Sequence, residues 1–289
     1  MWALAAAASF SVMAAFVKFC NNVYGPLELV FYRSLFTVLT ILVIVWSHGY
    51  SLKTTHIKEH MKRDVMGFCS VSIWFLTLGQ LPLGTNITLT YTTSIFLAIN
   101  FIILALIRHT HIPWGAIGAI VLGFTGIVNV VQPSFASGQE LASMLCLSVA
   151  LLDLFIYWQV RRLGELGEPS WRIVFYFALF SSLATLVGVF LFEGGFHKPT
   201  YQSGLAVLGM GLFATIGMLT STRAWIGGNM LLVSCLGFSA IPFSEIISVL
   251  FFNNESNWRS LFGMLLIIVA GMLATIFTKR EEAKLQAKK

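Results

Sequence analysis

The chain has 289 residues, of which 57% are hydrophobic and only 10% charged, and its formal net charge is +6. Because soluble globular domains are about 25% charged, this composition excludes an ordinary water-soluble protein. The basic residues gather in the connections between apolar runs, where membrane topology explains them. The positive charge therefore does not indicate a nucleic-acid partner.

Ten apolar runs follow one another along the chain. Each is close to the roughly 20 residues that a helix needs to cross a hydrocarbon core about 30 Å thick. Their connections are short and rich in turn formers, which leaves no room for a soluble domain. The first run has no basic lead-in and no cleavage site, so we expect a retained helix rather than a signal peptide. The predicted spans are residues 1–19, 27–47, 65–81, 85–107, 113–131, 139–160, 172–192, 202–221, 229–252 and 259–278.

The distribution of Lys and Arg predicts the orientation of these spans. Fourteen of the 18 basic residues fall on the side that would hold both termini. Lys18, Lys198 and Arg259 fall on the other side, and Arg33 lies inside a span. Since cytoplasmic loops carry the excess of positive charge, we expect both termini to be cytoplasmic. We expect the membrane to be a bacterial inner membrane.

The chain contains an internal repeat. The sequence "VFYRSLF" at Val30 to Phe36 returns as "VFYFALF" at Val174 to Phe180. Two further pairs match in the same order, and they are Leu89–Phe96 with Leu236–Phe243 and Gly118–Gly126 with Gly263–Gly271. This order predicts two halves, residues 1–135 and 136–289, with five spans each.

Because five is odd, the second half would enter the membrane from the opposite side. Inverted repeats of this kind let a site near the midplane open to one face and then to the other, which is the logic of alternating access. An alternative is that duplication only built a ten-helix scaffold, and inverted repeats also permit channels.

The segments "FYRS", "LPLGTNITLTYTTSIF", "GFTGIVNVVQP" and "GFSAIPFSEIISVLFF" resemble the EamA family of the drug/metabolite transporter (DMT) superfamily. The resemblance covers nearly the whole chain. It implies an all-α integral membrane fold of ten transmembrane helices, and the export or exchange of small metabolites, often amino acids. One departure is that family halves usually close their fourth helix with a Glu; the second half offers Glu255 and the first half has no acid there.

Ionisable residues inside the spans are the first candidates for a substrate site, because each needs a partner or a wet cavity in the membrane. Glu245 lies three residues after Pro242, whose missing N–H frees a backbone carbonyl and can break the helix. Phe238 falls on the same helical face as Glu245. The alternative for Glu245 is a buried acid bonded to a neighbouring hydroxyl or Arg.

Two further ionisable residues are candidates. Asp153 shares a face with Tyr157 one turn away, which allows a hydrogen bond between them or contact with a ligand or proton. Arg33 suits a substrate carboxylate, and its counterpart in the second copy is Phe177. The alternative for Arg33 is a structural pair with Glu28 or extension of its side chain to the outer surface.

Uncharged candidates come from the third and fourth spans. The fourth span has a polar stripe that includes Asn100, whereas repeat symmetry favours the face of Tyr91, and the sequence does not decide between these faces. Trp74 in the third span could stack on a ligand. We therefore expect substrate contacts among Glu245, Tyr91, Asn100, Asp153, Tyr157, Trp74, Phe238 and Arg33.

The leading hypothesis is a secondary transporter that exports or exchanges small polar metabolites, most of all amino acids, between the lipid bilayer's two sides. Runner-up substrates are nucleotide-like or cofactor-like molecules and cationic drugs, and a passive channel is the less favoured mechanism. A membrane-embedded enzyme is not expected, because the six histidines fall in segments interpreted as solvated loops. No phosphate-binding loop, metal motif or CxxC spacing is present, so we expect no cofactor or metal. Oligomeric state is left open.

Overall fold

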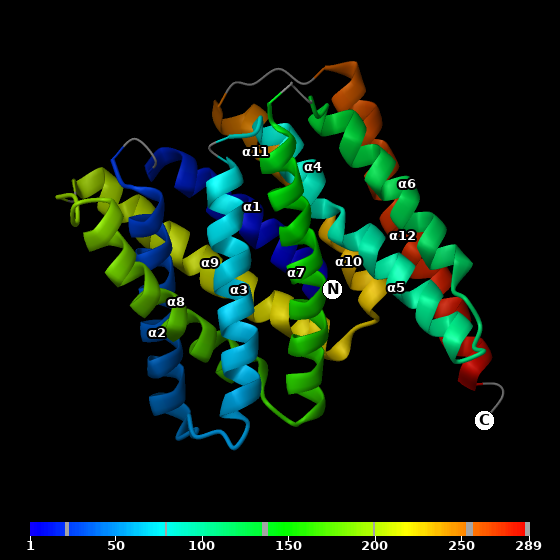
Figure 1. Cartoon of the computed structure of the whole chain (residues 1–289), viewed down its shortest axis with the longest axis horizontal. Coiled ribbons are helices and arrows are strands. Elements are labelled where there is room, and N and C mark those ends of the chain that lie inside the picture. Colours follow the sequence, from blue (N-terminus) through cyan, green and yellow to red (C-terminus); the bar gives the residue numbers. More distant parts are fainter. Residues whose placement is uncertain (21–22, 79, 135–137, 199, 253–256, 287–289) are drawn as a thin grey trace. The chain divides into compact units, whose positions relative to one another are not determined.

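The computed structural model describes residues 1–20, 23–78, 80–134, 138–198, 200–252 and 257–286, and these fold into α-helices (Figure 1). In chain order the helices are α1 (Trp2–Cys20), α2 (Pro26–His48), α3 (Ile57–Leu78), α4 (Leu83–Tyr91), α5 (Thr93–Ile107), α6 (Trp114–Val131), α7 (Glu140–Glu165), α8 (Ser170–Phe192), α9 (Tyr201–Gly227), α10 (Met230–Gly237), α11 (Ala240–Phe252) and α12 (Trp258–Gln286).

Nine spans within the described part of the chain are long and apolar enough to cross a membrane. Two of them, Thr85–Ile107 and Met230–Phe251, each contain two helices separated by a break. The prediction of an all-α integral membrane protein is confirmed. The predicted count of ten is not reached, because α3 is not among the nine. Its first turns carry a run of charged residues, namely Lys58, Glu59, Lys62, Arg63 and Asp64.

The described chain forms two compact units. Unit 1 consists of Met1–Phe68 and Trp158–Gly227, and unit 2 consists of Cys69–Tyr157 and Gly228–Lys289. Each unit therefore takes segments from both predicted halves of the sequence. Helices α3 and α7 each contribute one end to unit 1 and the other end to unit 2.

In unit 1, α2 and α8 pack against each other in antiparallel directions (Figure 1). At one end, Glu193 just past α8 accepts hydrogen bonds from the backbone N–H groups of Leu27 at 2.8 Å and Glu28 at 3.1 Å. These donors lie in the first turn of α2, where N–H groups have no partner within the helix. At the other end, the Tyr176 hydroxyl donates to the Leu52 carbonyl at 3.0 Å. Buried side chains from both helices, among them Ile41, Val174 and Phe175, form one hydrophobic cluster.

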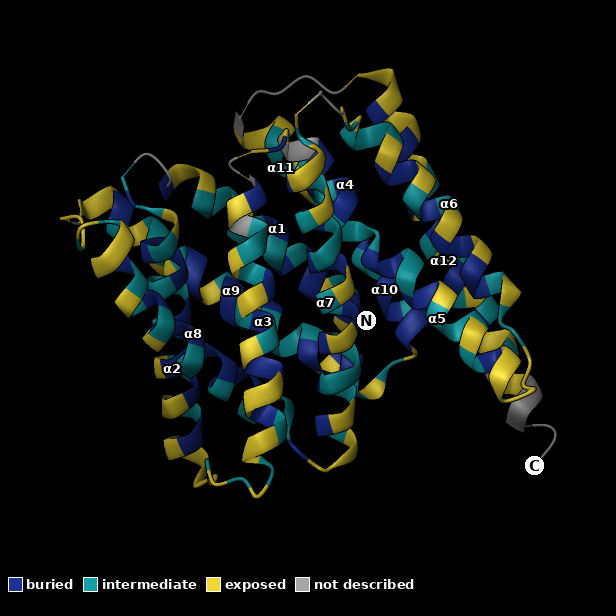
Figure 2. Ribbon diagram, viewed as in Figure 1, coloured by how far each residue is buried: buried dark blue, intermediate teal, exposed yellow. Residues whose placement is uncertain are grey.

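In unit 2, α6 and α12 approach so closely that their backbones touch. A Cβ atom added at Gly126 would lie 2.7 Å from the Gly263 carbonyl oxygen, and one added at Gly263 would lie 2.6 Å from that of Gly126. Small residues at helix crossings are typical of membranes, where close packing replaces the hydrophobic effect between helices. Buried and exposed residues alternate along both helices (Figure 2), as expected when one face meets protein and the other lipid.

Candidate functional site

The two broken spans belong to unit 2, and both breaks fall within matched segments of the repeat. Helix α4 ends at Tyr91 and α5 begins at Thr93, while α10 ends at Gly237 and α11 begins at Ala240. At each break, a hydrogen bond between residues three apart replaces the usual helical bond between residues four apart. The Thr92 N–H donates to the Leu89 carbonyl and the Phe238 N–H to the Cys235 carbonyl, both at 3.2 Å.

The two breaks contain different residues. Pro242 has no N–H to bond the Phe238 carbonyl four residues earlier, and the Ile241 N–H takes that carbonyl instead at 3.0 Å. The first break contains no proline. There the Thr92 hydroxyl donates to the Thr88 carbonyl at 3.2 Å, and this back-bonding bends helices. The prediction that Pro242 interrupts its helix is confirmed, with the break placed one turn before the proline.

Tyr91 and Phe238 join the two breaks. Their ring centroids lie 5.7 Å apart with an interplanar angle of 76°, which is the favoured edge-to-face geometry. Phe238 is fully buried, and its ring lies over Gly123 of α6, where an added Cβ would be 2.6 Å from the ring. Tyr91 and Phe238 occupy the same position in the matched segments, so the contact is formed between repeat counterparts.

Asp153 and Tyr157 extend this cluster along α7. The Ser70 hydroxyl of α3 donates a hydrogen bond of 2.6 Å to the Asp153 carboxylate. Tyr157 lies within electrostatic range of both Asp153 and Tyr91. Four predicted residues, Tyr91, Asp153, Tyr157 and Phe238, are thus brought together in unit 2. Ser70 was missed, because one hydroxyl in an apolar helix cannot be distinguished by sequence from a packing residue.

Trp74 belongs to the same face of α3 as Ser70. Ser70, Trp74 and Thr77 recur at intervals of four and three residues, which places them on one face of the helix. Ser70 on this face bonds Asp153, and Thr77 accepts a hydrogen bond of 2.9 Å from the Asn86 amide. Trp74 therefore lies between two contacts to neighbouring helices of unit 2, and its side chain is half-buried.

The polar stripe of the fourth span forms a packed network. Asn86 is fully buried, and its backbone carbonyl accepts a hydrogen bond of 2.9 Å from the Thr90 hydroxyl. The thiol of Cys146 lies 3.7 Å from the same hydroxyl. Asn100, two turns into α5, is half-buried, and its Oδ1 atom has no hydrogen-bond partner among the described residues.

Glu245 lies on α11 beyond the second break, where its side chain is half-buried between exposed neighbours, Ser244 and Ile246. On α10, before the second break, Ser234 donates a hydrogen bond of 2.6 Å to Ser94 of α5, and both residues are buried. Glu255 lies outside the described residues. Within the described ranges, no group of three or more His, Cys, Asp and Glu side chains could hold a metal ion.

Arg33 belongs to unit 1, where it lies about two turns into α2. Its Nε atom is buried and has no hydrogen-bond partner in the part of the chain that the structure describes. The predicted alternative of an Arg33–Glu28 pair is not found, because among the described residues the ion-pair partner of the Glu28 carboxylate is His197. Nδ1 of His197 lies 2.8 Å from it, and the Tyr32 hydroxyl donates to it at 3.0 Å.

His48 lies in the last turn of α2 rather than in a loop, and the prediction that all six histidines are solvated loop residues is wrong above all for His60. This side chain lies in the first turn of α3 and is fully buried. The neighbouring lysines and arginine made the segment look solvent-exposed in the sequence. Burial of the imidazole comes instead from the turn between α7 and α8, which the sequence does not place next to it.

Comparisons with known proteins give relatives over almost the whole chain. An uncharacterised transporter of Helicobacter pylori is 23% identical and is matched over 95% of this chain and 93% of its own length. The pseudopaline exporter CntI of Pseudomonas aeruginosa is 25% identical, and the match covers 93% of this chain and 92% of the exporter. An S-adenosylmethionine uptake transporter of Rickettsia bellii is 20% identical, and the match covers 100% of this chain and 95% of that transporter.

No family model matches the chain. A solved crystal structure of a protein has the same fold, with a TM-score of 0.83, 17% sequence identity and 97% of each chain covered. The relatives are named as transporters, and their names differ in both substrate and direction.

Proposed function

We propose that the chain is a secondary transporter of small polar metabolites and an EamA-like member of the DMT superfamily. In this proposal residues 1–135 and 136–289 are inverted repeats of five transmembrane helices each, with α3 as the span that completes ten. The contact between Tyr91 and Phe238 carries the proposal. It joins two helix breaks at matched positions, and broken helices are where transport sites form.

The cluster around Asp153 supports a proposal for the substrate class. A carboxylate in a membrane span attracts a cationic group, and the aromatic faces of Tyr157 and Tyr91 add cation–π attraction. Both features suit a substrate with a protonated amine. Amino acids are the first candidates, and we propose export or exchange as the direction.

Several residues take secondary roles in this proposal. Trp74 and Phe238 supply apolar surface to the substrate, and Glu245 and Asn100 line the path beyond the breaks. Arg33, which belongs to unit 1, is a candidate contact for a substrate carboxylate. Neither a cofactor nor a metal is needed. The chain lies in a bacterial inner membrane with both termini cytoplasmic.

A cofactor-like cation is the second candidate substrate. The relative named as an S-adenosylmethionine uptake transporter supports it, and an anionic site flanked by aromatic rings would accept such a molecule as well as an amino acid. Nucleotide-like molecules and cationic drugs follow. A passive channel would require fluxes far above those of a carrier.

The test is uptake of labelled compounds into proteoliposomes that contain the purified full chain, with and without a pH gradient. The panel holds amino acids, S-adenosylmethionine and a cationic dye. We expect saturable uptake of an amine-bearing compound, lost in Asp153→Asn and reduced in Glu245→Gln. Leu151→Val is the matched control, because Leu151 lies on an exposed face of the same helix two residues away.

Each outcome is informative. Saturable uptake that Asp153→Asn leaves unchanged would remove Asp153 from the site. Flux that does not saturate would favour a channel. If folded protein moves none of the panel, the proposed substrate class is wrong.

A further inference from the structure

Unit 1 holds one acid–histidine pair at the start of α2. Glu28 is fully buried in the first turn of this helix. Its carboxylate lies 2.8 Å from Nδ1 of His197, accepts the His197 backbone N–H at 3.0 Å, and accepts the Tyr32 hydroxyl at 3.0 Å. His197 lies in the segment between α8 and α9, so the pair ties that segment to α2.

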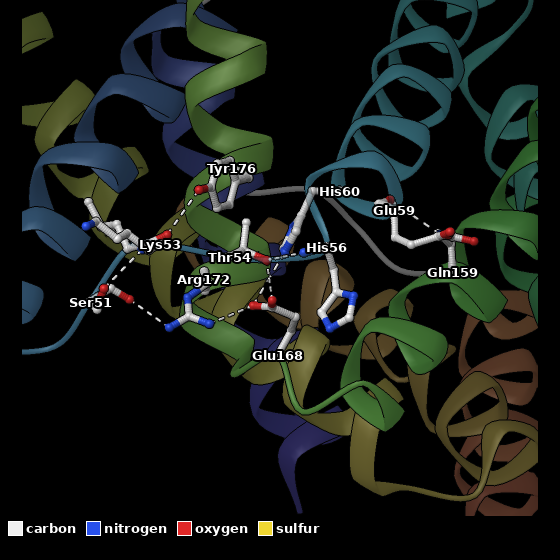
Figure 3. Close-up of polar contacts among 11 residues, drawn as sticks. Ser51, Lys53, Thr54, His56, Glu59, His60, Gln159, Glu168, Arg172 and Tyr176 are labelled. Atoms are coloured by element: carbon white, nitrogen blue, oxygen red, sulfur yellow. Dashed lines mark hydrogen bonds and ion pairs between the residues drawn. The ribbon is translucent and has the colours of Figure 1, made fainter.

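A second pair lies at the start of α8 (Figure 3). Glu168 immediately precedes Pro169, the N-cap of α8, and is 5% exposed. Its carboxylate accepts hydrogen bonds from the Thr54 hydroxyl and, at 2.9 Å, from the Arg172 guanidinium. Nε2 of His60 lies 3.5 Å from the same carboxylate. The His60 ring centroid is 4.7 Å from that of Tyr176.

The repeated heptapeptide supplies a tyrosine to each of the two pairs. Tyr32 and Tyr176 are the tyrosines of "VFYRSLF" and "VFYFALF". Tyr32 donates to the acid of its pair, Glu28, at 3.0 Å, whereas Tyr176 packs against the histidine of its pair, His60, at 4.7 Å between ring centroids. Because α2 and α8 are antiparallel, the pairs lie at opposite ends of unit 1. The shared tyrosine therefore has a structural role in both copies.

The second pair holds a whole segment in place. The Arg172 guanidinium donates to the Ser51 carbonyl at 2.7 Å, and the Tyr176 hydroxyl donates to the Leu52 carbonyl at 3.0 Å. Together with the Thr54 contact, these bonds attach residues 49–56, between α2 and α3, to the first turns of α8. Figure 3 shows Thr54, His60 and Arg172 directed toward Glu168.

The two histidines differ in their surroundings. The His197 side chain is 52% exposed, whereas that of His60 is 0% exposed. Neither ring nitrogen of His60 has a hydrogen-bond partner among the described residues. The charged groups that act on His60 are Glu168, Arg172 and Arg63. Asp64 follows one turn later on the same helix.

We propose that His60 and Glu168 form a proton-binding site that controls the attachment of residues 49–56 to α8. While His60 is neutral, it packs against Tyr176 and the segment stays attached. A proton on His60 would create an imidazolium that is shut off from water, a cost that Glu168 at 3.5 Å opposes and to which Arg172 and Arg63 add repulsion. Exposure of the His60 imidazolium to water removes this free-energy cost of burying a charge. Proton binding therefore favours the arrangement in which residues 49–56 are detached.

The direction of the pH effect follows from linkage. Burial lowers the pKa of His60 from its ordinary value of 6.5, and the nearby Glu168 opposes that shift. A histidine with a lowered pKa binds its proton less tightly in the attached arrangement than in the detached one. The attached arrangement is therefore favoured above pH 6.5 and is progressively lost as the pH falls below that value. If the chain is the transporter proposed above, acidification on the side of residues 49–56 opens that end.

The test follows hydrogen exchange of residues 49–60 in the purified full chain in nanodiscs, at pH 7.5 and 5.5, with each rate divided by its intrinsic value. We expect protection of this segment to fall by up to about tenfold per pH unit as the pH drops below 6.5, until His60 is protonated in the attached arrangement as well. His60→Gln should remove this pH dependence. His197→Gln and His56→Gln, as matched controls, should keep it.

Wild-type protein alone can overturn the proposal, if residues 49–60 are equally protected at both pH values. A pH dependence that survives in His60→Gln would also overturn it, because another group would then titrate. If His60→Gln does not fold, His60→Phe replaces it, since a neutral ring can still pack against Tyr176. None of these readouts requires transport, so they stay separate from a failure of the proposed function.

Discussion

Tyr91 and Phe238 meet edge to face, 147 residues apart in the chain, at the two places where the membrane helices of unit 2 break. A contact between repeat counterparts couples the two breaks directly. Any rearrangement that separates α4 from the end of α10 must first break this aromatic pair. The pair is therefore a natural place to test how the two breaks depend on each other.

We expect Phe238→Ala to lower the thermal unfolding midpoint strongly, since removing a fully buried Phe costs about 3–5 kcal/mol. Gly123→Ala should also destabilise the protein, because its Cβ would lie 2.6 Å from the Phe238 ring. In the Phe238→Ala background, Gly123→Ala should cost much less. The double-mutant cycle, measured by thermal unfolding in detergent, checks this coupling. Strict additivity of the two changes would contradict it.

Ser70→Ala should weaken substrate affinity. The mutation removes the hydrogen bond of 2.6 Å to Asp153, and a hydrogen bond to a charged group contributes about 1.5–3 kcal/mol. We expect KM for uptake to rise by about tenfold or more, while Ser70→Thr, which keeps the hydroxyl, restores it. Ser72→Ala is the control, because Ser72 is exposed on the same helix. An unchanged KM in Ser70→Ala would mean that Ser70 does not position Asp153 for substrate.

Gly25→Ala should destabilise the start of α2. An added Cβ would overlap the Glu193 carboxylate, which caps two N–H groups of this helix. Loss of such a cap costs about 1 kcal/mol, and we expect a lower unfolding midpoint. Gly204→Ala should not lower the midpoint, since an added Cβ there has no neighbour within 4 Å and Ala favours the helix over Gly. Equal effects of the two changes would argue against the cap.

Asp64 should make stability depend on pH. Burial raises the pKa of Asp64 from 3.8 to about 7, although the adjacent Arg63 opposes the shift. Since the folded protein holds this proton more tightly than the unfolded chain, stability falls as the pH rises from about 4 to about 7. We expect Asp64→Asn to remove that fall and to raise the midpoint above pH 7.

Unfolding midpoints measured from pH 4 to 8 provide the check for Asp64. Glu165→Gln serves as the control, because the Glu165 side chain is 68% exposed. Parallel curves for wild type and Asp64→Asn would show that Asp64 has an ordinary pKa.

Arg33→Met should raise stability and lower transport. The Nε atom of Arg33 is buried without a hydrogen-bond partner among the described residues, and burying an unpartnered polar group costs free energy. We therefore expect a higher unfolding midpoint and reduced uptake of carboxylate-bearing compounds. Lys18→Met, at the exposed end of α1, should change neither. A marked drop in the midpoint of Arg33→Met would indicate a structural role instead.

Much of the fold could be predicted from the sequence, because lipid leaves a spanning segment little choice but helix. Apolar runs therefore mark the helices well, as for α2, predicted at 27–47 and found at Pro26–His48. The third span was placed less well, since α3 begins at Ile57 within a charged segment. Hydropathy marks only the apolar part of a helix, so it does not show that α3 begins in the charged segment before that part.

The candidate site was only partly accessible to sequence reasoning. Asp153 and Tyr157 could be recognised, because an acid in an apolar span always needs an explanation. Their proximity to Tyr91 depends on which faces of α4 and α7 meet, and helical periodicity does not supply that. The buried state of His60 was also hidden, since its neighbours along the chain are charged and its cover comes from a turn more than 100 residues away.

The crossing of Gly126 and Gly263 bears on how the sequence can diverge. Every other amino acid adds at least one carbon where the partner's carbonyl oxygen already lies. No substitution at either position is small enough to be absorbed without moving a helix. A substitution at either glycine is therefore expected to be destabilising. Relatives that keep this crossing should keep both glycines, while other positions of α6 and α12 can vary.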